Sequence, residues 1–327
     1  MYNEDIKKSF IDDYYKNCSL SRREACVYAF NAVEPVEEGC GADLCTLSGG
    51  DLEEAIKLVV GLRASSSSLG VSICRSYVRW CIEHDVDGAC DDLLKMKLKN
   101  IKLNSMRTRM VFSPADLQEY LDALFEKESE YTVDTIFRCY YWLAYAGMDE
   151  EDVFRIERGN VDIENMAVVY NGEEYPIYRE GLMAVMNSAT RLAFRYKNSA
   201  YTPGKQITLR DRLPGEKLVR GIRGDGSPIS FRVNIAKKSR IAEKEGKTDR
   251  RLSYKRIWLS GLFYRIYRGE QSGIPADFTE VAERLIEKSV ENGADPDGIA
   301  IRQKRRRMMH DFRLDYERWK SEVEEMK

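Results

Sequence analysis

Apolar and polar residues alternate at helical spacing in the first 95 or so residues of the chain. The segment 21–33 (SRREACVYAFNAV) opens with Ser21 and Glu24, a capping-box pattern, so we predict a helix that begins there. The segment 37–45 (EEGCGADLC) is rich in Gly and Cys and predicts a loop after that helix.

Two more helices are predicted in the same part of the chain. Ser48 with Asp51 favours a helix start before the segment 51–63, and the serine run Ser65–Ser68 precedes the segment 69–85. The apolar stripe of that last segment is Leu69, Ile73, Tyr77 and Trp80. These patterns predict a small bundle of helices, followed by a basic linker with few apolar residues.

A second domain is predicted to begin at Ser113-Pro114-Ala115-Asp116, with Ser at the N-cap, Pro at the first helical position and Asp two positions later. One helix is predicted over 116–129, and a more apolar helical pattern lies within 132–148, where Gly147 ends the helix. A short helix is expected over 149–158.

The segment 161–178 alternates apolar and polar residues and contains Asn171-Gly172, which predicts a β-hairpin. Helical spacing returns over 181–197, a basic stretch rich in Gly and Pro follows, and three helical patterns run from about Ser253 onwards. The predicted class is mainly α with a small antiparallel β-sheet, in two domains: 1–95 and 113–327, joined by a basic linker over 96–112.

Composition supports two packed domains, since 43% of the residues are hydrophobic and 32% are charged. No apolar run approaches the ~20 residues that a membrane span needs, and the first ten residues are polar. We therefore expect neither a signal peptide nor a membrane partner, and a cytoplasmic location.

Eight cysteines are present: Cys18, Cys26, Cys40, Cys45, Cys74, Cys81, Cys90 and Cys139. Several lie within apolar helical patterns, as buried thiols do in a reducing compartment. Cys40 and Cys45 are open to interpretation as a metal pair, but the chain has two histidines and no CxxC. We expect plain buried thiols, no metal and no cofactor.

Charge is distributed unevenly along the chain. Between Arg195 and Gln271 there are 20 Lys and Arg against 7 Asp and Glu, a net of about +13 in a chain whose total is −2. Twelve of those cations are arginines, which bind phosphate in a bidentate manner. A polyanion-binding surface explains this asymmetry; the alternative is a solvated helix surface with scattered cations.

The order of these elements resembles the tyrosine recombinases, the phage-integrase family, over nearly the whole chain. The segment 65–86 (SSSSLGVSICRSYVRWCIEHDV) is similar to the DNA-facing helix of their core-binding domain. The segment 138–165 (RCYYWLAYAGMDEEDVFRIERGNVDIEN) is similar to the start of their catalytic domain. The resemblance implies a helical core-binding domain, an integrase catalytic-like domain, and double-stranded DNA as the partner.

The catalytic residues implied by this resemblance are absent. Asp149 occupies the position of the first catalytic arginine, and the hairpin expected to supply a lysine carries Glu173 and Glu174. A carboxylate repels the phosphate that an arginine would bind, by about 1–4 kcal/mol at ~4 Å. The expected His-x-x-Arg helix best matches the segment Lys255 to Trp258. We therefore expect no recombinase activity.

Tyr316 is the candidate nucleophile in this alignment. The functional interpretation makes it the attacking tyrosine; the structural one makes it a packing residue three positions before Trp319. Without its arginines a tyrosine gains little, since loss of one oxyanion partner typically costs ~10²–10³ in rate. We favour packing.

The remaining expectation is DNA binding. The candidate DNA-binding residues are Ser66, Ser67, Ser68, Arg75, Arg79, Lys97, Lys99, Lys102, Lys237, Lys238, Arg240, Arg250, Arg251, Lys255 and Arg256. A second basic cluster, Arg302 to Arg307, either contacts DNA or balances the acidic residues that follow it.

Segments such as SLSRREACVYAFN, YKRIWLSGLFYRIYRGE and LDYERWK resemble lytic-cycle repressors of SPbeta-type temperate phages. This narrower resemblance implies a transcriptional regulator of a phage or prophage. Two alternatives stay open: a divergent active recombinase that uses Tyr316, and an architectural accessory of a recombination complex. A homo-oligomer and a regulatory protein or peptide are also left open as partners.

Overall fold

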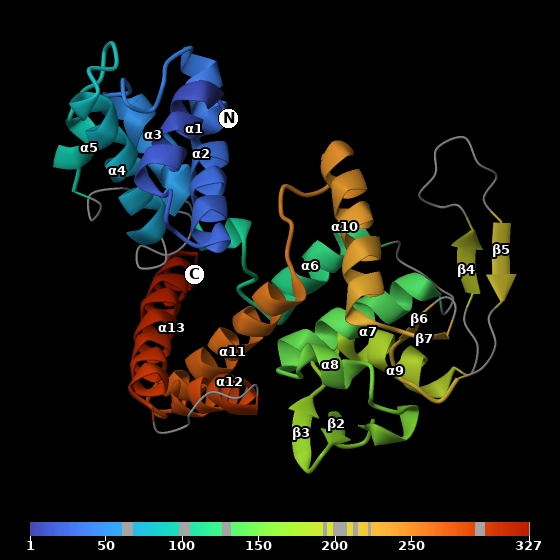
Figure 1. Cartoon of the computed structure of the whole chain (residues 1–327). Coiled ribbons are helices and arrows are strands. Elements are labelled where there is room, and N and C mark those ends of the chain that lie inside the picture. Colours follow the sequence, from blue (N-terminus) through green and yellow to red (C-terminus); the bar gives the residue numbers. More distant parts are fainter. Residues whose placement is uncertain are drawn as a thin grey trace. The chain divides into compact units, whose positions relative to one another are not determined.

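The computed structural model describes residues 1–60, 68–97, 105–125, 132–191, 195–198, 208–211, 215–221, 224–291 and 298–326. The chain divides into two compact units (Figure 1). Unit 1 contains Met1–Ser105 and Ala282–Asp315, and unit 2 contains Met106–Val281 and Tyr316–Lys327.

Unit 1 is helical, which confirms the predicted bundle. Its N-terminal helices are α1 (Glu4–Tyr14), α2 (Leu20–Cys40), α3 (Gly49–Val60), α4 (Ser68–Glu83) and α5 (Asp92–Lys95). The ring of Phe10 lies 6.0 Å from Phe30 and 5.4 Å from Tyr77, so α1, α2 and α4 share one core. All three rings are fully buried. Aromatic pairs of this geometry contribute about 0.5–1.5 kcal/mol each beyond the burial of area.

The predicted bounds of α2 were wrong at both ends. The helix begins after Ser19, so Ser21 lies inside its first turn and forms no capping box. It continues through the predicted loop to Cys40 and ends at Gly41, whose φ of 63° suits glycine. Burial of Val36 and Glu37 explains the extension, because tertiary packing outweighs the weak helix propensity of Gly39.

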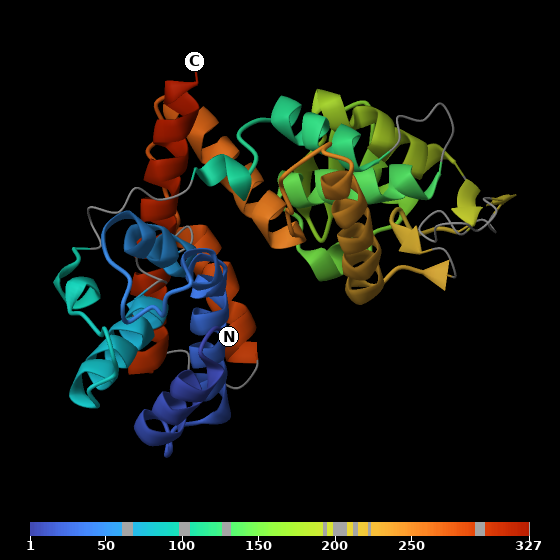
Figure 2. The same ribbon diagram turned by 90° about the horizontal axis from the view of Figure 1, so that it is seen from above.

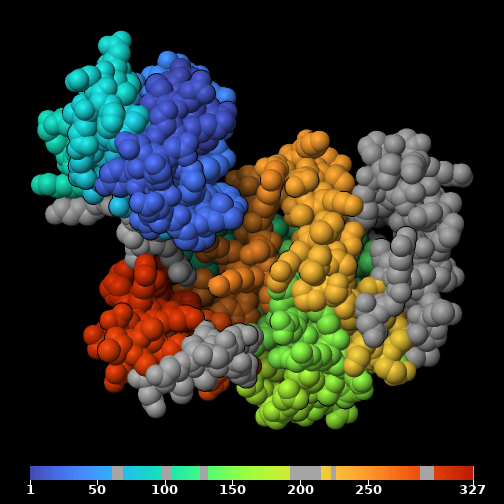
Figure 3. Space-filling view, in the orientation of Figure 1, coloured from blue at the N-terminus to red at the C-terminus, as the bar shows by residue number. Residues whose placement is uncertain are grey.

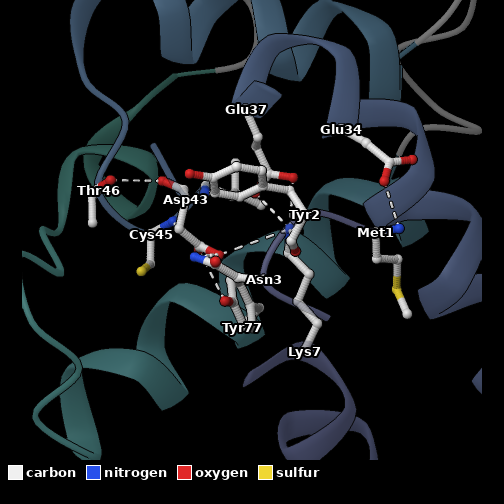
Figure 4. Close-up of polar contacts among 11 residues, drawn as sticks. Met1, Tyr2, Asn3, Lys7, Glu34, Glu37, Asp43, Cys45, Thr46 and Tyr77 are labelled. Carbon is white, nitrogen blue, oxygen red and sulfur yellow. Dashed lines mark hydrogen bonds and ion pairs between the residues drawn. The ribbon is translucent and has the colours of Figure 1, made fainter. Parts of the chain in front are cut away.

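A buried cluster of charges organises the centre of unit 1 (Figure 4). The Lys7 ammonium lies 2.6 Å from both carboxylate oxygens of Glu37, and it donates to the carbonyl of Tyr2 at 2.8 Å. The second carboxylate, Asp43, lies 3.9 Å from the same ammonium. Lys7 and Glu37 are fully buried. This ion pair therefore joins α1 to the end of α2.

Asp43 and Glu37 also hold the loop that follows α2. Asp43 accepts hydrogen bonds from the Tyr77 hydroxyl at 2.9 Å and from its own loop at Cys45 N, 3.0 Å away. Glu37 accepts from Leu44 N at 2.7 Å. Burial raises the pKa of the Glu37 carboxyl, although Lys7 acts in the opposite direction. The loop is thus fixed by carboxylates that water does not reach.

Unit 2 is built around α7 (Val133–Ala146), in which every residue except Arg138 is buried. A helix that is apolar on all sides belongs in a core. The unit also contains α6 (Pro114–Leu124), α8 (Glu150–Val153), α9 (Leu182–Thr190), α10 (Pro228–Lys244) and α11 (Tyr254–Gln271). Helices α12 (Thr279–Glu291) and α13 (Ile299–Glu325) contribute residues to both units.

The predicted helix start at Ser113 is confirmed in detail, although unit 2 itself begins at Met106. The Ser113 hydroxyl accepts a hydrogen bond from Asp116 N at 3.1 Å, and Pro114 occupies the first helical position of α6. Asp116 in turn accepts from Phe112 N at 2.9 Å. The end of α7 at Gly147, with a φ of 105°, is also as predicted.

Three small antiparallel sheets are present among the described residues, where one was expected. The first contains β1 (Val161–Asp162), β2 (Ala167–Tyr170) and β3 (Glu173–Pro176). Asn171 and Gly172 both have positive φ, 51° and 80°, which confirms the predicted tight hairpin. The other two pair β4 (Arg195–Asn198) with β5 (Thr208–Asp211), and β6 (Arg220–Gly221) with β7 (Gly224–Asp225).

Two predictions in the middle of unit 2 were wrong. The helix predicted over 181–197 ends at Thr190, and Arg195–Asn198 is a strand. Helix α10 lies in the stretch that we had expected to be basic and rich in Gly and Pro. Its buried positions are Phe231, Ile235, Ser239 and Ala242. They follow helical spacing, but two of them are small or polar, so the apolar stripe is weak.

Close approach of α11 to α7 depends on one glycine. A Cβ atom at Gly261 would lie 1.8 Å from the carbonyl oxygen of Tyr145. Helix α10 lies beside another part of α7 (Figures 1 and 2). The ring of Phe231 on α10 lies 4.9 Å from Phe137 and 5.1 Å from Tyr140 of α7. Helices α10 and α11 thus converge on the same central helix.

Within the described ranges, no helix combines the length and apolar character that crossing a bilayer requires. The same ranges hold no group of three or more His, Cys, Asp or Glu placed to bind a metal ion. Of the cysteine pair considered above, Cys40 is exposed and Cys45 is buried.

Candidate nucleic-acid interface

The candidate residues of unit 1 differ in how free their side chains are. Arg75 is half-buried, and its guanidinium donates to the carbonyls of Leu93 at 3.3 Å and Met96 at 2.5 Å. It therefore ties α4 to the end of α5, where carbonyls lack helical partners. Arg79, one turn later, is exposed. Ser68 begins α4, whereas Ser66 and Ser67 lie outside the described residues.

Only part of the predicted linker is described. Lys97 is exposed, and Lys99 and Lys102 lie outside the described residues. The basic cluster 302–307 lies on α13, where Arg305 pairs with Glu283 of α12 at 2.6 Å. Arg302, Arg306 and Arg307 are exposed.

Two candidate cations of unit 2 are structural ion pairs. Lys238 lies 2.6 Å from Asp134 of α7, and Arg250 lies 2.9 Å from Asp116 of α6. Their side chains are 12% and 9% exposed. These pairs anchor α10 and the following loop to the core. Both cations therefore serve the fold and are not available to bind a phosphate.

The other cations of unit 2 lie nearer to solvent. Arg251 is exposed and pairs with Glu243, and Arg256 is half-buried and already has a partner in the described chain. Lys237, Arg240 and Lys255 are exposed, and the described residues provide none of them with an acidic partner. Helix α10, which carries two of the three, is exposed along its length in Figure 3.

Arg240 and Lys255 lie at a cavity of about 520 Å³ between α7, α8, α10 and the start of α11. We call it the α10 pocket. Its lining residues are Tyr140, Tyr141, Glu150, Arg232, Ile235, Ala236, Ser239, Arg240, Arg251, Leu252, Ser253, Tyr254 and Lys255. Four cations and one carboxylate thus surround a largely apolar and aromatic interior. No pattern in the sequence predicts this pocket, because the weak apolar stripe of α10 left that helix unpredicted.

Hydrogen bonds fix the interior of the α10 pocket. The Tyr140 hydroxyl donates to Glu150 at 2.5 Å, and Arg232 Nε donates to the same carboxylate at 2.9 Å. The Tyr254 hydroxyl donates to the carbonyl of Met148 at 2.8 Å. Burial raises the pKa of both tyrosines, so their hydroxyls stay neutral. The pocket therefore presents a net positive, hydrogen-bonding surface that suits an anion.

The positions aligned with catalytic residues serve other purposes. Trp258 is 8% exposed and donates from Nε1 to the carbonyl of Gly147 at 2.9 Å. Asp149 is the residue just before α8 and already has a partner. Glu173 and Glu174 are exposed on β3, and Glu173 accepts from the Tyr175 hydroxyl at 2.6 Å. Carboxylates thus stand where the resemblance implies cations.

Tyr316 is a packing residue in this structure. It is 2% exposed, its ring lies 5.5 Å from Phe263 and 5.6 Å from Phe278, and it stacks on Trp319. Its hydroxyl donates to Glu270, which also lies 2.9 Å from Lys320. Burial and the Glu270 carboxylate raise the pKa of the phenol well above its ordinary value. The hydroxyl is therefore held protonated on an acid.

We expect Tyr316→Phe to destabilise unit 2 by about 1–3 kcal/mol, because Glu270 loses a hydrogen bond to a partly buried charge. Burial acts to raise the pKa of Glu270, but the bonds from Tyr316 and Lys320 lower it overall. A lowered folded pKa adds stability above the ordinary value of 4.5, and that stability is lost as the pH falls through the folded pKa.

Urea unfolding at pH 7 and near pH 3 measures this difference. The gap between the wild type and Tyr316→Phe should narrow at the lower pH, while Tyr28→Phe, at a 76% exposed position, should change nothing at either pH. If the difference in unfolding free energy between the two proteins grows at the lower pH, the Tyr316 hydroxyl does not stabilise the Glu270 carboxylate.

Comparison with known protein families identifies the N-terminal part. Residues 1–83 match the family described as MrpR, N-terminal core-binding domain. The match ends with α4 and so covers helices α1 to α4, including the three that share the Phe10 core. No curated protein matches the chain. The predicted resemblance is thus confirmed for this region, which is a tyrosine recombinase-like core-binding domain.

Proposed function

Because residues 1–83 form an MrpR-type core-binding domain, we propose that the chain is a sequence-specific, double-stranded DNA-binding regulator without recombinase activity. The observation that carries the proposal is the combination of this domain with exposed cations at Lys237, Arg240 and Lys255 in unit 2. Such cations bind backbone phosphates and release counterions. Regulation then follows from occupancy of a site, as for a phage or prophage repressor.

In this proposal α10 lies against the major groove. Its exposed surface carries Ile229 and Val233, which are 73% and 49% exposed, together with Lys237 and Arg240. Major grooves accept one α-helix, and apolar side chains there contact thymine methyl groups. Arg240 and Lys255 contact phosphates and set the position of the helix on the duplex. Arg79 and Lys97 add phosphate contacts from unit 1.

The absence of cutting is the second part of the proposal. Phosphodiester cleavage by a tyrosine needs cations around the phosphate and a free phenol. Here Asp149, Glu173 and Glu174 are acids, and the Tyr316 phenol is buried against Glu270. Each of these features opposes the charge that cleavage develops, so binding is the activity that remains.

Selection of bound genomic fragments tests the proposal. The full chain should enrich one discrete duplex sequence, and a nicked suicide substrate carrying that sequence should give no covalent protein–DNA product. An adduct that disappears in Tyr316→Phe would establish a divergent recombinase instead. Scattered fragments with strong bending would establish an architectural accessory.

A further inference from the structure

We propose that the α10 pocket is a binding site for a free phosphorylated small molecule with a planar body, of the nucleoside monophosphate class. Its volume of about 520 Å³ lies within the ~300–1,000 Å³ typical of small-molecule sites. The residues that line it come from the core of unit 2 alone, so the site is complete within one unit.

Within the described residues, two of the four cations of the pocket are paired with carboxylates and two are not. The two unpaired cations indicate where the anionic group of the ligand binds. Arg232 pairs with Glu150, and Arg251 pairs with Glu243. Arg240 and Lys255 have no acidic partner among the described residues, and both line the cavity. Two cations that line one cavity and have no acidic partner among the described residues favour a doubly charged group such as a phosphate monoester.

Backbone N–H groups at the start of α11 provide further donors for the anionic group of the ligand. Ser253 precedes α11, a helix of 18 residues, and its hydroxyl accepts from Arg256 N. The N–H groups of Tyr254 and Lys255 have no acceptor in the described part of the chain, and both residues line the pocket. Free N–H groups at the start of a helix bind phosphate oxygens and add to the effect of the two cations.

The residues in the interior of the pocket indicate the nature of the uncharged part of the ligand. Tyr140, Tyr141 and Tyr254 line it, with ring centroids of Tyr140 and Tyr254 4.7 Å apart. Ile235, Ala236 and Leu252 complete an apolar surface beside them. A phosphate alone would fill only part of a cavity of about 520 Å³, whereas a phosphate that carries a planar body of nucleoside size would also occupy the space beside these residues.

The ligand would regulate DNA binding, a consequence that rests on the proposed function. Arg240 and Lys255 are the side chains that we assign to DNA phosphates, and one cation cannot serve both partners at full strength. A bound small molecule therefore lowers the affinity for duplex DNA, and DNA lowers the affinity for the small molecule by the same factor.

Calorimetric titration and thermal unfolding of the full chain without DNA test the site directly, with AMP, adenosine and inorganic phosphate as probes. We expect AMP to bind and to raise the melting temperature, with adenosine and phosphate at least ten-fold weaker. Arg240→Gln/Lys255→Gln should weaken AMP binding at least ten-fold. Arg155→Gln/Lys247→Gln, which changes two exposed cations outside the pocket, should bind AMP as the wild type does.

No binding of AMP at millimolar concentration, or equal binding by the pocket variant, would overturn the site. If inorganic phosphate binds as tightly as AMP, the proposal that the ligand has a planar body is wrong. DNA binding is measured in parallel without AMP, so the two proposals fail separately. If the chain binds DNA but not AMP, the proposed pocket ligand is wrong and the proposed function stands. If the chain binds AMP but no duplex DNA, the pocket ligand stands and the proposed function is wrong.

Discussion

Under the proposed function, we expect the double change of Arg240 and Lys255 to glutamate to lower the affinity of the full chain for its duplex site by about 100-fold at ~0.1 M salt. Each phosphate contact contributes close to a factor of ten there, through released counterions, and the new carboxylates add repulsion. The slope of log affinity against log salt should also fall by about two. Neither cation has an ion-pair partner among the described residues, so the fold loses no pair.

Fluorescence anisotropy across a salt series measures both effects. The matched control is Arg155→Glu/Lys247→Glu, which makes the same change in net charge at side chains 63% and 58% exposed. It should reduce the affinity only slightly. If both double variants lose the same affinity, the binding reflects net charge alone, and helix α10 with Arg240 and Lys255 is not the DNA interface.

Lys7→Met is expected to destabilise unit 1 by about 3–5 kcal/mol, the usual cost of leaving a buried charge without its partner. The change leaves the buried carboxylates Glu37 and Asp43 without a cation. Since burial already raises the pKa of Glu37, its protonation should relieve the cost as the pH falls. A second change, Glu37→Leu in the same chain, should recover much of the loss, because it removes the orphaned charge.

Hydrogen exchange of amides in α2 and α4 measures this loss for unit 1 without interference from unit 2. Lys8→Met is the control, since Lys8 is 59% exposed and pairs with Glu4 one turn away on the surface. Equal protection in the two variants would show that the buried cluster contributes nothing to stability.

Local signals in the sequence predicted the parts of the fold that local chemistry decides. The Ser113 cap, the Gly147 helix end and the Asn171-Gly172 turn each depend on two or three neighbouring residues, and all three are confirmed. The end of α2 and the whole of α10 depend on distant partners instead. Glu37 is drawn into the core by Lys7, thirty residues away, and Lys238 on α10 pairs with Asp134 of α7.

The same division applies to the candidate site. A count of cations found the basic stretch of unit 2, but charge alone did not separate the cations in ion pairs from those that face solvent. Arg250 and Lys238 are nearly buried, whereas Arg240 and Lys255 line a cavity. The α10 pocket combines residues from α7, α8, α10 and α11, more than one hundred positions apart at its extremes, so no spacing rule reveals it.

The last turns of α13 are attached to the first residues of unit 2. Trp319 donates from Nε1 to the carbonyl of Val111 at 3.1 Å, and Glu322 accepts from Met106 N at 2.8 Å. A copy that donated this helix to a neighbour without receiving one in return would lose both hydrogen bonds and leave the Trp319 site empty. Any assembly of this chain must therefore keep a C-terminal helix on each Met106–Val111 segment, either its own or one received in exchange.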